Sequence, residues 1–128
     1  MQAITQQWVD KAEGDWEAAG RAMRAQERPF YDHVCFHSHE CTEKYLKGRL
    51  VEADVAFPKT HNLPHLLTLL LPIEPTWQIL EPDLLGLKTS GVGIVYPGKK
   101  ADKADAQAAL RYCRTVREVA RRSLGLPL

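Results

Sequence analysis

The sequence predicts an all-α protein, an up-and-down bundle of four to five helices that forms a single domain over residues 1–128. Apolar residues recur at steps of three and four along most of the chain, the spacing of one buried helix face. No window alternates with a period of two for long enough to make a strand. The one strand candidate, residues 92–96, has no partner strand.

The first two helices are expected to be long. The hydroxyl of Thr5 can cap the first helix, and Arg28 with Pro29 can stop it. Its inward face is predicted from three- and four-residue steps as Trp8, Ala12, Trp16, Ala19 and Met23. The second helix is expected from Asp32, acting as its N-cap, to about Ala53.

A short third helix is expected after the loop that follows. Asn62 is its predicted N-cap, and Pro64 stands in its first turn, where a missing N–H costs nothing. Its core face is predicted as Leu66, Leu67, Leu70 and Leu71. Pro72 is expected to end it.

The remaining chain is expected to add one broken helix and one long helix. Residues 73–90 keep helical spacing, but Pro82 must kink or restart the helix there. A turn-rich loop at residues 91–98 comes next. The last helix is expected from about Asp102 to Leu124, with six residues inward: Ala106, Ala109, Leu110, Cys113, Val116 and Ala120.

Composition and charge exclude several classes of protein. Hydrophobic residues make up 45% of the chain and charged residues 26%, and the net charge of +1 gives no overall attraction to nucleic acid or membrane. Three cysteines without a Cys-x-x-Cys pair argue against a disulfide framework and favour a reducing compartment. The N-terminus lacks a signal-peptide pattern, and no apolar stretch is long enough to span a bilayer. We therefore expect a cytoplasmic protein without a membrane segment.

The second helix carries an unusual set of polar residues among apolar ones. Helical geometry places four of them on one narrow stripe: His37, Glu40, Lys44 and Lys47. His39 and Glu43 lie elsewhere, among apolar side chains. Because they are spaced i, i+4, they can hydrogen-bond to each other and offset the cost of burying both. We interpret them as a structural polar pair.

A metal cluster is the alternative interpretation of the same helix. Its candidate donors are His37, His39, Glu40, Cys41 and Glu43, with His61 and His65 able to approach from elsewhere. On a helix, however, His37 and Cys41 share one face. His39 and Glu43 point about 160° away from that face. A satisfied structural histidine is favoured over zinc, so we expect no metal site and no cofactor.

Residues 93–100 match the first seven positions of a phosphate-binding P-loop. No strand precedes them, and Lys100 replaces the Ser or Thr that would hold Mg²⁺, which argues against a true P-loop. A looser interpretation remains open. Free backbone N–H groups, together with Lys99 and Lys100, stand just before a helix N-terminus and suit an anion.

Several short segments occur in an order that is specific in combination. They are Trp8, Ala12, Asp15 and Ala19; Cys35, Phe36 and His37; residues 43–47 (Glu-Lys-Tyr-Leu-Lys); residues 59–63 (Lys-Thr-His-Asn-Leu); Tyr96, Pro97 and Gly98; and residues 104–113. Together they resemble a HEPN domain (higher eukaryotes and prokaryotes nucleotide-binding) of the small prokaryotic type. The resemblance covers nearly the whole chain.

The resemblance implies a helical bundle that pairs as a two-fold dimer. Active members of the family cut RNA without metal, using an Arg followed after four to six residues by a His near the start of the last core helix. The histidine would act as general acid or base for the 2′-hydroxyl, and the arginine would stabilise the phosphate. Other members resemble toxins or antitoxins paired with a minimal nucleotidyltransferase, and still others only bind nucleotides or act as assembly modules.

The sequence departs from the active pattern at the decisive place. Val95 stands where the family's Arg-Tyr-Pro loop has arginine, and no histidine follows His65. Arg28 and His33 do match the spacing, but they lie between the first two helices, and roughly one such match is expected by chance. His37 can substitute as a base, although no partner arginine can be assigned to it.

These observations predict a homodimer without nuclease activity that binds a nucleotide, RNA, or a partner protein such as a minimal nucleotidyltransferase in a toxin–antitoxin-like system. The predicted ligand-binding residues are His37, Lys44, Lys47, Tyr96, Lys99 and Lys100, with no catalytic residue. Two alternatives stay open. One is a divergent metal-independent ribonuclease toxin that uses His37 or His33. The other is a protein-interaction scaffold, which an exposed apolar patch would favour.

Overall fold

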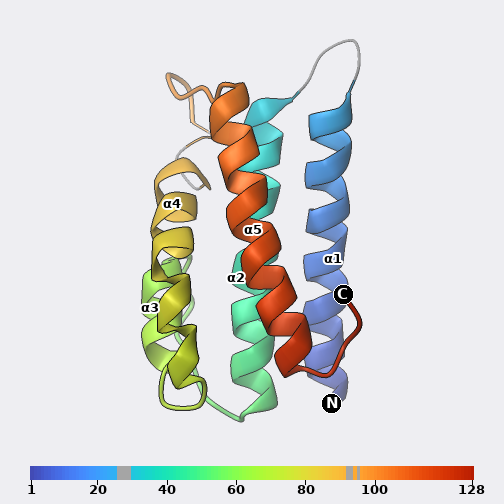
Figure 1. Ribbon diagram of the computed structural model, residues 1–128, viewed down its shortest axis with the longest axis vertical. Coiled ribbons are helices and arrows are strands. Elements are labelled where there is room, and N and C mark those ends of the chain that lie inside the picture. Colours follow the sequence, from blue (N-terminus) through green and yellow to red (C-terminus); the bar gives the residue numbers. More distant parts are fainter. Residues whose placement is uncertain (26–29, 92–93, 95) are drawn as a thin grey trace.

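The computed structural model describes residues 1–25, 30–91, 94 and 96–128, and over these it contains helices and no strand. The helices are α1 (Ala3–Arg24), α2 (Tyr31–Glu52), α3 (Leu63–Leu70), the 3₁₀ helix η1 (Pro75–Leu80), α4 (Glu81–Gly91) and α5 (Lys103–Ser123). The predicted all-α class is confirmed. Helices α1, α2, α4 and α5 run up and down, with α3 and η1 in the connection between α2 and α4 (Figure 1).

Two predictions fall wholly or partly on residues outside the described ranges. The proposed stop of the first helix at Arg28 and Pro29 lies outside them, and so does most of the strand candidate at residues 92–96. The spacing match between Arg28 and His33 also begins outside them. Of the P-loop-like segment, Ile94 and residues 96–100 are described.

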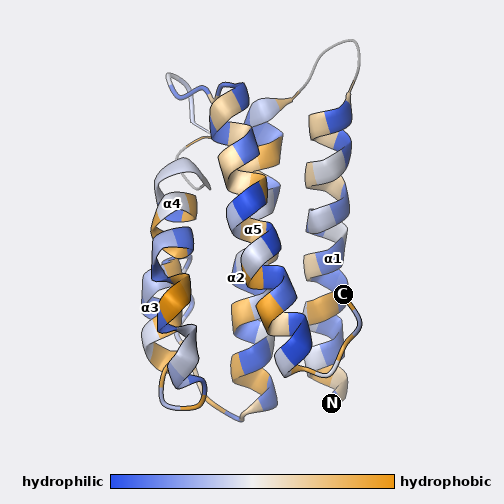
Figure 2. Ribbon diagram, viewed as in Figure 1, coloured by the Kyte–Doolittle hydropathy of each residue, from blue (hydrophilic) through white to orange (hydrophobic). Residues whose placement is uncertain are grey.

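Helix α2 is the centre of the bundle, because α1, α3, α4 and α5 all pack against it. Twelve of its 22 residues are buried, including polar ones. A helix covered on most sides has no single apolar face, which explains why its polar and apolar residues are mixed. Helices α1 and α5 contain many hydrophilic residues along their length (Figure 2).

The core lies between α2, α3, α4 and α5. Its largest fully buried apolar side chains are Tyr45, Leu46, Leu50, Leu63, Leu66, Leu70, Leu80, Leu84 and Leu87. The predicted inward residues of α5 are buried except for the half-buried Leu110. On α1, Ala12 and Ala19 are fully buried, whereas Trp8, Trp16 and Met23 are half-buried at the edge of the core.

One predicted helix cap, one predicted helix start and one predicted break are confirmed. The side chain of Asn62 accepts a hydrogen bond from the backbone N–H of His65 at 3.0 Å, which caps α3. Asp102 caps α5 in a reciprocal capping box with Asp105. Pro82 restarts the helix, since it is the second residue of α4 directly after η1.

Two other predicted caps are wrong, because long-range contacts occupy the side chains. Helix α1 begins two residues before Thr5, whose hydroxyl is buried and donates to Glu52 Oε1 at 2.9 Å. Helix α2 begins one residue before Asp32, which accepts a hydrogen bond from the backbone N–H of Ala101 at 2.7 Å. These two contacts tie the start of α1 to the end of α2, and the start of α2 to the segment before α5.

Candidate functional site

The polar side chains of α2 separate into two networks, so the predicted stripe does not stay together. The network that faces α1 contains His37, Glu40 and Lys44. The network that faces the segment before α3 contains His39, Glu43 and Lys47.

Asp15 of α1 is the centre of the first network. Its Oδ1 lies 2.8 Å from His37 Nδ1, and its Oδ2 accepts a hydrogen bond from Lys44, whose Nζ is also 3.3 Å from Glu40 Oε2. Burial by itself would lower the pKa of Lys44, but the hydrogen bond and charge of Asp15 outweigh it and raise the pKa overall. Lys44 is therefore the counter-ion of two half-buried carboxylates rather than a free cation for a phosphate.

Glu43 is the centre of the second network. Lys47 Nζ donates to its Oε2 at 3.0 Å, and His61 Nδ1 lies 2.8 Å from its Oε1. The ammonium of Lys47 also lies near the rings of Trp8 and Phe57, 6.0 and 5.8 Å from their centroids. With only 7% of the residue exposed, Lys47 is enclosed and does not reach a surface groove.

The contact between Glu43 and His61 joins two segments that are separate in sequence, residues 43–47 and 59–63. The Glu43 side chain is 5% exposed and the His61 side chain 67% exposed. A buried carboxylate thus fixes the orientation of an exposed imidazole ring. The ring also anchors the loop between α2 and α3 to the centre of the bundle.

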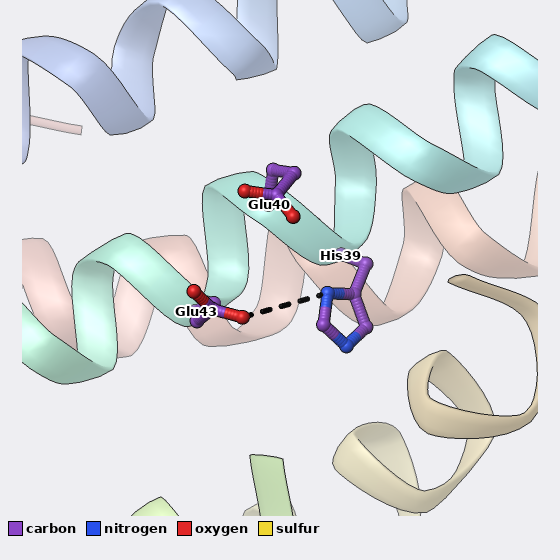
Figure 3. A group of neighbouring side chains, drawn as sticks. All are labelled: His39, Glu40 and Glu43. Atoms are coloured by element: carbon purple, nitrogen blue, oxygen red, sulfur yellow. Dashed lines mark ion pairs between the residues drawn. The ribbon is translucent and has the colours of Figure 1, made fainter. Parts of the chain in front are cut away.

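His39 and Glu43 lie together on α2, as the i, i+4 spacing predicts, but they do not form the expected hydrogen bond. Their closest atoms, His39 Nδ1 and Glu43 Oε1, are 4.0 Å apart (Figure 3). Neither ring nitrogen makes a hydrogen bond of normal geometry within the described part of the chain, although the backbone of His61 lies near the ring. Burial lowers the pKa of His39, more than the Glu43 carboxylate raises it, so the ring is neutral near pH 7.

A cleft lies at the end of the bundle where α2 begins. One hollow of about 380 Å³ is lined by Asp32, His33, Phe36, His37 and Ile94. An adjoining hollow of about 320 Å³ shares His33 and His37 and adds Phe30 with residues of α1, among them Arg21. Since both hollows share these two histidines, we call the combined region the His33–His37 cleft.

The predicted loop residues lie at the same end of the bundle as this cleft (Figure 1). The hydrogen bond between Asp32 and the N–H of Ala101 holds the residue that precedes Asp102, the N-cap of α5, against the start of α2. Tyr96 is 64% exposed, and Lys99 and Lys100 are exposed as well. Within the described ranges, neither of these lysines pairs with an acidic side chain. Of the predicted ligand-binding residues, His37 and the loop residues lie at the same end of the bundle. Lys44 and Lys47 instead bind the carboxylates of Asp15 and Glu43.

The N-terminus of α5 does not offer the free anion site that the sequence suggested. The N–H of Asp105 is bound by the Asp102 carboxylate, and the N–H of Asp102 by the Asp105 carboxylate. Two negative side chains therefore occupy the positive end of the helix.

Sequence reasoning missed two residues of the site, Asp15 and Arg21, and named His33 only for the ribonuclease alternative. Asp15 orients His37, and Arg21 and His33 line the cleft. Asp15 shares a helical face with Ala12 and Ala19, which were predicted to face inward. This spacing could have indicated that the Asp15 side chain faces the neighbouring helix. No local pattern indicates that Arg21 lies near the two histidines, because that proximity depends on how α1 packs against α2.

Comparison with known proteins agrees with this architecture. The family model described as HEPN domain matches residues 5–123 of the 128-residue chain. No curated protein and no solved structure matches the chain at a significant level. Among the described residues, no helix combines the length and the apolar character needed to cross a bilayer. The family match spans α1 to the end of α5, and on this basis the chain belongs to the HEPN domain family.

Proposed function

We propose that this protein binds a phosphate-bearing ligand, a nucleotide or a short stretch of RNA, at the His33–His37 cleft, and that it does so without cutting it. The observation that carries the proposal is the gathering of two imidazoles, an exposed tyrosine ring and two exposed lysines at one end of the bundle. Lysine ammonium groups attract phosphates, and a tyrosine ring accepts a stacked base.

The ligand-binding set in this proposal is narrower than the one predicted from the sequence. It keeps His37, Tyr96, Lys99 and Lys100 and adds His33. Lys44 and Lys47 take no direct part, because each is bound to a carboxylate inside the bundle. Their removal would act through the stability of the bundle rather than through the ligand.

The absence of cleavage is proposed from the chemistry of the sequence. Histidine does not occur after His65, so α5 has no imidazole to act as acid or base. Val95 also stands where the loop of the active pattern has arginine, so the group that would stabilise the phosphate is replaced there.

Binding of a labelled short RNA and of ATP at low salt tests the proposal. The double variant Lys99→Gln/Lys100→Gln should weaken RNA binding and lower the slope of log K against log salt by at most roughly 1.4, about 0.7 for each phosphate that is no longer neutralised. Lys11→Gln/Lys59→Gln removes the same charge from exposed sites on α1 and before α3, and should leave binding unchanged. Equal weakening in both variants, or no binding by the parent, would contradict the proposal.

A second function, metal-independent RNA cleavage, is favoured by one specific arrangement. Asp15 holds His37 Nδ1 as the carboxylate of a catalytic dyad would, and Arg21 lines the same hollow as His33 and His37. In the free protein Arg21 pairs with Glu17, so an entering phosphate would have to displace that carboxylate.

Incubation of RNA with the purified protein and a chelator separates the two functions. Cleavage that disappears in both His37→Ala and Asp15→Asn, but persists in the exposed-site control His65→Ala, would establish the second function. Binding without product establishes the first. If the chain neither binds nor cleaves, the proposal that survives is recognition of a partner protein such as a minimal nucleotidyltransferase.

We further propose that the protein is a homodimer, in keeping with its membership of the HEPN domain family. Light scattering of the purified chain tests this proposal. It should give twice the chain mass, and a monomeric parent would contradict the proposal.

A further inference from the structure

His39 is the least satisfied polar residue in the described part of the chain. Its side chain is 1% exposed, yet both ring nitrogens lack a hydrogen-bond partner there. Burying a polar group without a partner costs free energy, and such a group in a native structure calls for an explanation such as an ion or a water.

Two carboxylates lie next to this imidazole. His39, Glu40 and Glu43 each present one ligand atom, and the three atoms lie within 4.8 Å of one another. Figure 3 shows the three side chains on one short stretch of α2, with the Nδ1 of His39 directed toward Glu43. One nitrogen and two carboxylate oxygens are a donor set typical of a divalent transition metal.

We propose that His39, Glu40 and Glu43 bind one divalent transition metal ion of the zinc class. In a tetrahedral site with bonds of about 2.0–2.2 Å, two ligand atoms lie roughly 3.3–3.6 Å apart. His39 Nδ1 and Glu43 Oε1 are 4.0 Å apart, so they would approach each other by about half an ångström when the ion binds. Glu40 is the most exposed of the three ligands, with 18% of its side chain exposed, and its carboxylate would turn toward the other two.

The neighbouring charged groups leave one oxygen of each carboxylate available. Lys44 binds Oε2 of Glu40 at 3.3 Å, and Lys47 binds Oε2 of Glu43 at 3.0 Å. The Oε1 of Glu43 faces His39 and accepts one contact from His61 at 2.8 Å, so it keeps a lone pair for an ion. His61 then supports the ligand from outside, as second partners of metal-bound carboxylates do.

An ion at this position competes with two ammonium groups for the carboxylates. Lys44 and Lys47 bind the Oε2 atoms, so the metal is held through the Oε1 atoms, and its added positive charge is accommodated when an ammonium group turns away from the site. The histidine nitrogen favours a transition metal over Mg²⁺ or Ca²⁺, which prefer oxygen donors throughout. This inference does not depend on ligand binding at the His33–His37 cleft.

Titration of the metal-free full chain with Zn²⁺, in competition with a coloured chelator, tests the proposal. The parent should bind one Zn²⁺ per chain, and Co²⁺ should give visible ligand-field absorption at the same stoichiometry. Glu40→Gln keeps the shape of a side chain at the edge of the core and should weaken binding about tenfold or more. His39→Gln should abolish the Co²⁺ absorption.

Matched controls make the test specific. His65→Ala removes an exposed histidine on α3, and Glu17→Gln removes an exposed acid on α1; both should bind Zn²⁺ like the parent. Because His39→Gln acts on a buried residue, its helix content is checked by circular dichroism, and Glu40→Gln carries the test if His39→Gln does not fold. No stoichiometric binding by the parent, or unchanged binding by Glu40→Gln, overturns the proposal and leaves water as the partner of His39.

Discussion

Arg117 of α5 holds the carboxylate of Glu13 on α1 with two nitrogens, Nε at 2.8 Å from Oε2 and Nη2 at 2.7 Å from Oε1. The hydroxyl of Tyr45 on α2 donates to the same carboxylate and accepts a hydrogen bond from Arg121 at 2.9 Å. One acidic side chain therefore connects three helices that are distant in sequence. Such bidentate pairs are stronger and more directional than single ion pairs.

Replacing Arg117 by lysine should destabilise the fold. A lysine keeps the charge but does not provide the planar pair of donors, so we expect the free energy of unfolding to fall by roughly 1–2 kcal/mol. Urea denaturation followed by circular dichroism measures this. Arg122→Lys changes an exposed arginine on the same helix and should have almost no effect. Equal destabilisation in both variants would show that the paired hydrogen bonds from Arg117 to Glu13 are unimportant for stability.

The same carboxylate should make stability depend on acidic pH. Burial alone would raise the pKa of Glu13, but hydrogen bonds from Arg117 and Tyr45 and the charges of Arg117 and Arg121 lower it below its ordinary value of 4.5. Its contribution is therefore complete above that value and is lost as the pH falls through the folded-state pKa. The stability difference between the parent and Glu13→Gln should be constant at neutral pH and shrink on acidification. A difference that grows toward low pH would contradict this assignment.

Two glycines in helices should respond in opposite directions to alanine. A Cβ on Gly86 of α4 would lie closest to Cε2 of the Tyr112 ring, 2.8 Å from its Cζ and 2.9 Å from its Cδ2, so Gly86→Ala should cost roughly 1–3 kcal/mol through overpacking. A Cβ on Gly14 of α1 meets nothing within 4 Å, so Gly14→Ala should stabilise by about 0.5–1 kcal/mol. Melting temperatures of the two variants check this, and a stabilised Gly86→Ala would show that the tyrosine ring moves freely.

The cysteines should be unreactive in the folded protein. Cys35, Cys41 and Cys113 are all buried, and burial, with help from nearby Asp105, raises the pKa of the Cys35 thiol to about 11. A coloured thiol reagent at mildly alkaline pH should modify them only after denaturant is added. Rapid modification of native protein would mean that the core opens locally.

Much of the fold is predictable from the sequence, because helices leave local signals. Asn62 and Asp102 act as caps within a few residues of their own position, and Pro82 restarts a helix by its covalent geometry alone. Thr5 and Asp32 carry the same kind of signal, and there it misleads. Their partners, Glu52 and the N–H of Ala101, lie far away in the sequence and compete successfully for the side chains.

The candidate sites are less predictable for the same reason. The helical period correctly places His39 and Glu43 together on α2, since that relation is local. The same period wrongly groups Lys47 with His37 and Lys44. Because the helix is covered on several sides, each lysine turns to a nearby carboxylate: Lys47 binds Glu43, and Lys44 binds Asp15. The contact of His61 with Glu43 has no local signal at all.

By itself, the sequence determined that the chain is helical, where most helices begin, and that it resembles a HEPN domain, because periodicity, capping residues and motif order are properties of neighbouring residues. Only the tertiary structure decided which polar groups meet. It set Asp15 against His37 and His61 against Glu43, and it placed the buried ring of His39 beside a carboxylate that lies beyond hydrogen-bonding distance. The physical reason is that burial forces each polar group to find the nearest partner, and nearness across helices is fixed by packing.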